Sequence, residues 1–265
     1  MFETFFGFAR TPFHKSLPPA DLFVSAQHQE LLARLHYLAA TRGLGVVSGE
    51  VGSGKSTTVR AWVPTLDPAR HRVIYLVAPT TPRTLYRAIC SHLGLEPAWL
   101  APDLARQAGD ALAALVAKGT TPVLLVDEAQ ELPPAVLTAL RFLTQAEMDS
   151  VSPLALILVG HPSLRQRLRL NTYEAFAQRV GLQFHLTGLT AAETVDYIRH
   201  HLRVAGRDQP LFTDAAVELL FHHSRGIPRV LNTLATQALL GAFQARQNLV
   251  DEHVVQKAVQ EAHAS

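Results

Sequence analysis

Residues 49–56 read Gly-Glu-Val-Gly-Ser-Gly-Lys-Ser and directly follow the apolar run Leu44–Val47. The glycines let the backbone curl so that successive N–H groups point at one anion, which β-carbons would obstruct. A helix from Ser56 to about Val63, stopped by Pro64, would aim the positive end of its dipole at the same anion. A Gly-rich turn of purely structural purpose is the alternative. The strand before the turn and the helix after it favour a phosphate-binding loop.

The spacing also assigns chemistry to the last residues of this loop. Lys55 is placed to reach the β- and γ-phosphates of a nucleoside triphosphate, and the hydroxyl of Ser56 is a ligand for Mg²⁺. We therefore expect ATP and Mg²⁺ as cofactors. The residues expected to hold the nucleotide from this loop are Gly49, Glu50, Val51, Gly52, Ser53, Gly54, Lys55, Ser56 and Thr57.

A second segment, which ends in two acidic residues, completes the pattern of an ATPase. The apolar run Val123–Val126 predicts a strand buried on both faces, and it ends in Asp127 and Glu128, where a parallel sheet holds its ligand. Asp127 can hold Mg²⁺ through water, and Glu128 is a candidate base that orients or deprotonates the attacking water. Because strands are often followed by charged loops, an apolar run before Asp-Glu is weak evidence by itself. The phosphate-binding loop upstream is what makes it indicate an ATPase. The pair predicts an enzyme that hydrolyses ATP to ADP and phosphate.

Composition sets wider limits. The chain has 265 residues and is 48% hydrophobic, which suits one α/β domain with a smaller appendage. It has no basic signal region and no apolar run of roughly 18 residues, so we expect a soluble, cytoplasmic protein without a membrane segment. The lone Cys90 excludes an internal disulfide, and the scattered histidines predict no structural metal. A net charge of +2 permits nucleic-acid binding but does not argue for it.

Strand and helix signals alternate, which predicts an α/β fold: a five-stranded parallel sheet flanked by helices. The expected strands are 44–47, 73–77, 123–126, 154–159 and 181–186. The expected helices of this domain are 26–40, 56–63, one capped by Thr81 with Gly94 beyond its end, 103–118 and 135–147. After Gly188 only helices are expected, at 191–204, 214–223, 228–244 and 251–262, the first with a Thr190–Glu193 capping box. We therefore expect a nucleotide-binding domain 1–187, with an N-terminal extension 1–42, and a small all-helical lid domain 188–265.

The expected fourth strand ends at His161, the third helix of the tail begins at Gly226-Ile227-Pro228-Arg229, and Arg179 directly precedes the fifth strand. With the loop and the acid pair, these residues resemble the AAA+ ATPases over almost the whole chain. The resemblance implies that His161 is the sensor 1 residue, where most relatives carry Asn or Thr, and that Arg229 is the sensor 2 arginine. It also implies an arginine finger that completes the site of an adjoining subunit. Arg179 is the first candidate for this role, and Arg165, Arg167 and Arg169 are the alternatives.

Several short runs narrow the resemblance further: Phe5-Phe6-Gly7-Phe8, Thr11-Pro12-Phe13, Leu22-Phe23-Val24-Ser25 with His28, Val47 to Thr57, and Leu158 to Leu164. They resemble the ExeA-like family. In one group of that family, the ATPase belongs to a secretion or pilus system and is joined to a membrane span and a peptidoglycan-binding module. The other, similar to the transposition regulators TnsC, TniB and IstB, assembles on DNA to recruit or activate a transposase. Because the chain ends at Ser265, straight after the lid, we place transposition first and secretion as the alternative.

The transposition hypothesis implies a homo-oligomer, either a ring or a helical filament, that binds duplex DNA without sequence preference. The expected contact is the turn after the second strand, because hydroxyls, a helix N-terminus and one arginine suit phosphate oxygens. Its residues are Thr80, Thr81, Arg83 and Thr84. The alternative is that Thr81 merely caps its helix. A third hypothesis is a scaffold that binds ATP but barely hydrolyses it, which the rate of hydrolysis alone would distinguish.

Overall fold

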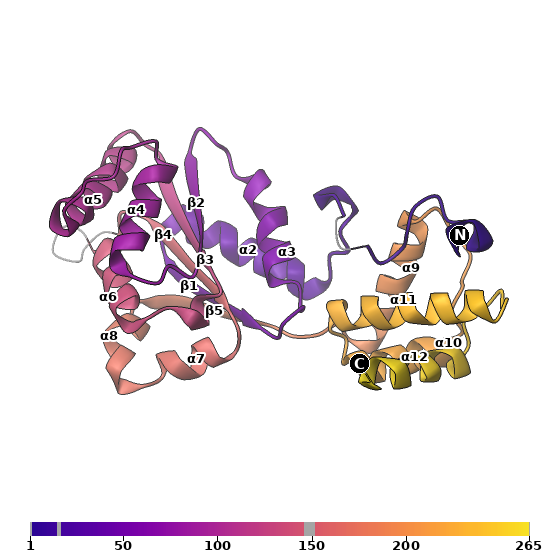
Figure 1. The fold of residues 1–265 in the computed structure, drawn as a ribbon. Coiled ribbons are helices and arrows are strands. Elements are labelled where there is room, and N and C mark those ends of the chain that lie inside the picture. Colours follow the sequence, from indigo (N-terminus) through magenta and orange to yellow (C-terminus); the bar gives the residue numbers. More distant parts are fainter. Residues whose placement is uncertain (1, 15–16, 146–151, 265) are drawn as a thin grey trace. The chain divides into compact units, whose positions relative to one another are not determined.

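The computed structural model describes residues 2–14, 17–145 and 152–264. Contacts between residues divide the chain into two compact units. The sheet unit comprises His28–Gly49 and Lys55–Leu186, and the helical unit comprises residues 1–27, Glu50–Gly54 and residues 187–265. Figure 1 labels their helices and strands.

Five parallel strands form the sheet, in the order β2-β3-β4-β1-β5. Because all strands run the same way, their carboxyl ends lie along one edge, where the phosphate-binding loop leaves β1 and the acid pair ends β3. The expected fold class is confirmed. The strands are β1 (Leu44–Gly49), β2 (His71–Val77), β3 (Thr121–Asp127), β4 (Ala155–Gly160) and β5 (Val180–Leu186).

Helices cover both faces of the sheet, which is why its central strands are continuously apolar. In β3, Val123 and Leu125 pack with α2 and α3, whereas Leu124 and Val126 pack on the opposite face with the other helices of this unit. Cys90 lies in this second core and is fully buried. The first layer is α2 (Ala26–Thr41) and α3 (Lys55–Trp62). The second is α4 (Pro82–His92), α5 (Ala101–Ala117), α6 (Pro134–Leu143), α7 (Ser163–Leu168) and α8 (Glu174–Ala177).

Local capping signals place several helix ends where the sequence predicts them. Thr81 and Thr84 form a reciprocal capping box at the start of α4, and Gly94, just beyond its end, has a φ of +75°. Thr190 and Glu193 do the same for α9. Helix α6 ends at Leu143, and the rest of the helix expected at 135–147 falls partly on residues 146 and 147, outside the described residues.

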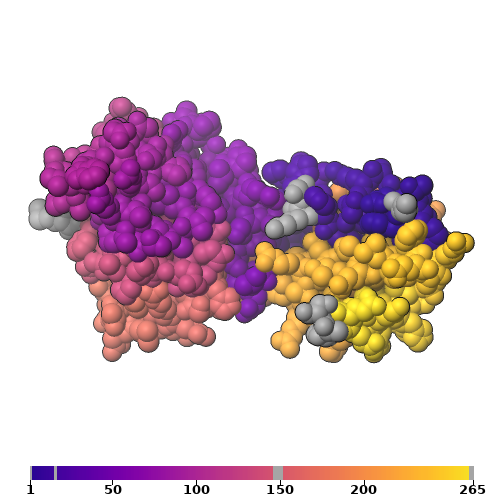
Figure 2. All heavy atoms as spheres, in the orientation of Figure 1, coloured from indigo at the N-terminus to yellow at the C-terminus, as the bar shows by residue number. Residues whose placement is uncertain are grey.

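The helical unit contains the expected four-helix tail and an additional N-terminal segment. Its helices are α1 (Phe2–Phe6), α9 (Ala191–Val204), α10 (Asp214–Ser224), α11 (Pro228–Gln244) and α12 (Glu252–Ala264). Phe6, Phe8 and Phe13 are at most 7% exposed and belong to the core of this unit. Figure 2 shows the indigo N-terminal residues lying against the yellow C-terminal helices of the same unit.

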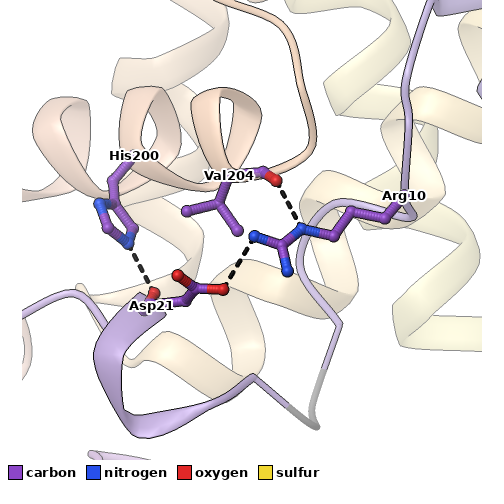
Figure 3. Close-up of polar contacts among 4 residues, drawn as sticks. All are labelled: Arg10, Asp21, His200 and Val204. Carbon is purple, nitrogen blue, oxygen red and sulfur yellow. Dashed lines mark hydrogen bonds and ion pairs between the residues drawn. The ribbon is translucent and has the colours of Figure 1, made fainter.

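Residues 2–27 therefore group with the tail helices, whereas the sequence analysis placed residues 1–42 with the α/β domain. Polar contacts reinforce the aromatic packing. Arg10 donates from Nε to the carbonyl of Val204 and from Nη2 to Asp21 Oδ2, and His200 Nε2 donates to the carbonyl of Asp21 (Figure 3). The reason for the difference is that the partners of this aromatic segment come from the far end of the chain.

Candidate nucleotide-binding site

The phosphate-binding loop joins β1 to α3, and its backbone shows why glycine is needed. Gly52 and Gly54 have φ values of +85° and +102°, in the region that only glycine adopts without strain. Gly49 differs from expectation because it is the last residue of β1 and belongs to the strand. Helix α3 begins at Lys55, one residue before the expected start.

Gly52 is also in close contact with Arg229, which the chain brings back from more than 170 residues away. Both belong to the helical unit. The backbone N–H of Arg229 donates to the carbonyl of Gly52 at 3.3 Å, and a β-carbon built on Gly52 would lie 2.4 Å from the Cβ of Arg229. The arginine expected to sense the nucleotide is thus next to the phosphate-binding loop. Its contact with a phosphate stays a prediction.

Lys55 and Ser56 stand at the start of α3, and both side chains have hydrogen-bond partners within the sheet unit. Lys55 Nζ donates to the carbonyl of Gly49, the last residue of β1, at 2.7 Å. The hydroxyl of Ser56 donates to Asp127 Oδ2 at 3.0 Å, which joins the loop to β3.

A hydroxyl beside one carboxylate fits Mg²⁺, which takes oxygen ligands and completes its shell with water and phosphate oxygens of a bound nucleotide. Within residues 2–14, 17–145 and 152–264 there is no group of three or more His, Cys, Asp or Glu side chains that could hold a metal without such help. Ser56 and Asp127 are therefore the residues that would hold Mg²⁺.

Tyr75 on β2 is a site residue that the sequence reasoning missed. Its hydroxyl donates to Asp127 Oδ2 at 3.0 Å, the same oxygen that accepts from Ser56, while the N–H of Glu128 donates to Oδ1 at 2.9 Å. Burial, together with the charge of Asp127, raises the pKa of Tyr75 to about 12, so its phenol is protonated and donates at neutral pH. Tyr75 reaches Asp127 because β2 and β3 are neighbouring parallel strands.

Tyr75→Phe removes one of the three donors that orient Asp127. We expect the Mg²⁺ concentration needed for half-maximal binding of a fluorescent ATP analogue to rise about tenfold, as for other groups that orient a metal ligand. Binding of the analogue without Mg²⁺ should be unchanged. Titrations with Mg²⁺ measure this, with Tyr37→Phe on the exposed face of α2 as the matched control. Equal Mg²⁺ dependence in the two variants would contradict the role of Tyr75.

Glu128 follows Asp127 in a left-handed backbone conformation, with φ +52°, and its side chain is exposed. Gln130 Nε2 donates to Glu128 Oε2 at 2.7 Å, and Gln130 Oε1 accepts from the backbone N–H of His161 at 2.9 Å. His161 thus lies where expected, directly after β4. Its ring Nδ1 accepts from the backbone N–H of Ser163 at 3.3 Å. A sensor role for His161 stays a prediction.

The arginines considered for the finger differ in their surroundings. Arg179 Nη2 donates to the carbonyl of Thr144 at 2.9 Å. Arg167 donates to the carbonyl of Gln130 at 3.1 Å and to the hydroxyl of Tyr173, so its guanidinium is used within its own chain. Arg165 is partly buried and Arg169 is exposed. Arg167 and Arg179 therefore both have partners within their own chain, and the assignment of the finger to Arg179 over its three alternatives stays a prediction.

The turn expected to contact DNA is occupied by local interactions. The hydroxyls of Thr81 and Thr84 form the capping box of α4, which confirms the capping role of Thr81. Arg83 Nη2 donates to the carbonyl of Trp99 at 3.1 Å, and its guanidinium lies 5.6 Å from the centre of the Trp99 ring. Trp99 is 81% exposed, so an aromatic residue does accompany Arg83, although it is distant in sequence. DNA contact by Thr80, Thr81, Arg83 and Thr84 stays a prediction.

Comparison with known proteins decides the class of this site. A family model described as "AAA domain" matches residues 38–168, which contain the phosphate-binding loop, Asp127, Glu128 and His161. The chain carries an AAA ATPase domain. General secretion pathway protein A of Aeromonas hydrophila is 40% identical over 253 residues, which cover 92% of this chain and 45% of that protein. The chain thus spans less than half the length of this relative, and the match supports an ExeA-like AAA+ ATPase.

Solved structures show the same AAA fold. Cdc6p of Pyrobaculum aerophilum has a TM-score of 0.68 at 17% identity and covers 98% of this chain and 70% of its own. The ORC2 protein of Aeropyrum pernix, in its ADPNP-ADP complexes, has 0.67 at 18% identity, covering 94% and 70%. The RuvB branch migration motor of Thermotoga maritima has 0.55 at 19% identity, covering 90% and 70%. At these identities the likeness concerns the fold alone.

Proposed function

We propose that this chain is the ATP-hydrolysing module of a secretion system of the general secretion pathway A type. The observation that carries the proposal is the 40% identity to the Aeromonas hydrophila secretion protein, which extends over 92% of the chain. The relative favours the secretion alternative over the transposition role that the sequence analysis placed first. No segment of the described residues forms a helix that is long and apolar enough to cross a membrane.

In this proposal the chain's own groups divide the work at the site. The loop from Gly49 to Thr57 holds the phosphates with backbone N–H groups, and the ammonium of Lys55 neutralises the β- and γ-oxygens. Bound Mg²⁺ supplies further positive charge to the same oxygens. Glu128 takes the proton of the attacking water, or orients that water, as charge develops on the γ-phosphate. We further propose that copies of the chain assemble into a ring or filament in which Arg179 reaches the neighbouring site.

Lys55→Ala tests whether hydrolysis takes place at this site. Removing the ammonium leaves the β- and γ-phosphates without their point-charge partner, so we expect affinity for a fluorescent ATP analogue to fall about 100-fold and hydrolysis to stop. Equilibrium titration and phosphate release measure the two quantities. Lys257→Ala, an exposed lysine on α12, is the matched control. Wild-type binding by the Lys55 variant would place the nucleotide elsewhere.

The effect of added duplex DNA distinguishes the secretion role from the transposition role. For a secretion ATPase we expect the same rate of hydrolysis with and without DNA, and no mobility shift of two unrelated duplexes at low or moderate salt. Nucleotide-dependent binding that weakens as salt rises would favour the transposition role, because neutralising phosphates releases counterions. Arg83→Ala would then weaken binding to both duplexes equally.

A further inference from the structure

Gln130 uses both ends of its side-chain amide within the site. It lies in the short 3-10 helix Ala129–Glu131 that follows β3. Its Nε2 donates to Glu128 Oε2 at 2.7 Å, and its Oε1 accepts from the backbone N–H of His161 at 2.9 Å. One side chain therefore joins the carboxylate after β3 to the end of β4.

The surroundings of Gln130 hold it in this position. Arg167 of α7 donates from Nη1 to the backbone carbonyl of Gln130 at 3.1 Å, and donates from Nε and Nη2 to the hydroxyl of Tyr173. Gly160, the last residue of β4, provides the space that the amide occupies. A β-carbon built on Gly160 would lie 2.6 Å from Gln130 Oε1 and 3.2 Å from the backbone nitrogen of Gln130. The amide thus packs where a side chain at position 160 would otherwise stand.

Glu128 needs such a partner because little else restrains its carboxylate. Its side chain is exposed, and an exposed glutamate loses rotamer entropy when it is held in one orientation. Its φ of +52° is sparsely populated for a residue with a side chain and persists only where neighbouring contacts favour it. The bond from Gln130 fixes Oε2 and leaves Oε1 with its lone pairs available to a water molecule.

We propose that Gln130 is a positioning residue for ATP hydrolysis. It holds one oxygen of Glu128 against the end of β4, so that the other oxygen faces the attacking water. The inference rests on the proposed role of Glu128 as the group that activates this water. Loss of the amide leaves the nucleotide contacts of the phosphate-binding loop intact. The defect should therefore lie in the rate of the chemical step and not in nucleotide affinity.

Two replacements remove either both hydrogen bonds of the amide or only the one that it donates to Glu128. Gln130→Met keeps the length of the side chain and removes both the donor and the acceptor. Gln130→Glu keeps an acceptor for the N–H of His161, loses the donor to Glu128 and places a second negative charge beside it. For both variants we expect the single-turnover rate of ATP hydrolysis to fall at least about tenfold, since misplacement of a reacting group by about 1 Å can cost about 100-fold. Affinity for a fluorescent ATP analogue should stay within about twofold of wild type.

Gly160→Ala tests the same arrangement from the other strand. Its β-carbon displaces the amide oxygen, so this variant should show the same loss of rate with the same retained affinity. Gln166→Met is the matched control, because Gln166 is exposed on α7, and it should behave as wild type. Thermal melting of each variant checks that the fold is retained.

A double-mutant comparison decides between the possible results. In the Glu128→Gln background, Gln130→Met should have no further effect on the residual rate, because the carboxylate that it positions is gone. Wild-type rates in the Gln130 variants, beside an inactive Glu128→Gln, would overturn this inference and leave the proposed function standing. Faster hydrolysis in Gln130→Met would also overturn it, because the amide would then hold the carboxylate away from water. An active Glu128→Gln would refute the proposed role of Glu128 itself.

Discussion

Replacing Glu128 by glutamine is expected to lower the rate of ATP hydrolysis about 10²- to 10⁴-fold, the usual contribution of a general base, while ATP still binds. The amide keeps the size of the side chain but cannot accept a proton from the attacking water. Lys55, Ser56 and Asp127 are untouched, so the contacts expected to hold the phosphates and Mg²⁺ are retained. Phosphate release measured beside equilibrium binding of a fluorescent analogue tests both halves of this expectation.

Glu131→Gln is the control for this variant. Glu131 lies three residues further along the same segment, and its side chain is exposed. Its backbone N–H donates to the carbonyl of Glu128, whereas the carboxylate of Glu128 accepts from the side chain of Gln130. The Glu131→Gln variant should hydrolyse ATP at the wild-type rate. Loss of activity in both variants would point to the acidic character of the segment, and loss of binding in Glu128→Gln would show that the carboxylate helps to hold the nucleotide.

Acidification is expected to destabilise the protein through His201. This residue of α9 is 3% exposed, and its ring is stacked on Phe13 with centroids 5.2 Å apart and lies 4.4 Å from the ring of Tyr197. Burial, reinforced by the neighbouring His200, lowers the pKa of His201 from 6.5 to about 3. Between these two values the unfolded chain binds a proton that the folded chain does not, so the free energy of unfolding falls as the pH falls. The loss from this one group is about 2 kcal/mol at about pH 5.

His201→Phe isolates this contribution from those of the other histidines. Phenylalanine keeps an aromatic ring against Phe13, and among the residues that the structure describes Nδ1 of His201 has no hydrogen-bond partner that the change would leave unpaired. Urea unfolding of the wild type and the variant at neutral pH and at about pH 5 should show a smaller acid-induced loss in the variant. His222→Phe, at an exposed position of α10, should retain the wild-type loss. Equal losses in all three proteins would refute the role of His201.

Much of the fold could be predicted from local signals. Helices α9 and α11 begin and end at the predicted residues because a capping box starts one and proline starts the other. The five strands differ from the predicted bounds by a few residues at their ends, where side-chain patterns are weakest. The short helices α1, α7 and α8 were missed because fewer than seven residues do not show a helical period.

The parts of the site that could not be predicted depend on contacts between distant segments. Lys55, Ser56, Asp127 and Glu128 were found because each belongs to a short pattern. The sequence shows Ala129 and Gln130 directly after the acid pair, but the role of Gln130 depends on a hydrogen bond from His161, 31 residues away, which no local pattern predicts. Tyr75 was missed for the same reason, since only the pairing of β2 with β3 brings it to Asp127.

The placement of Phe6, Phe8 and Phe13 has a consequence for the order of events during synthesis. Apart from Glu50–Gly54, the sheet unit is one continuous stretch, so its strands can pair before residues 187–265 are made. The helical unit cannot form its core until α9–α12 are synthesised, because that core combines the N-terminal phenylalanines with residues of these four helices. Until these helices are synthesised, Phe6, Phe8 and Phe13 therefore lack their packing partners. They form a transiently exposed aromatic stretch of the kind that chaperones bind and that promotes aggregation when synthesis stalls.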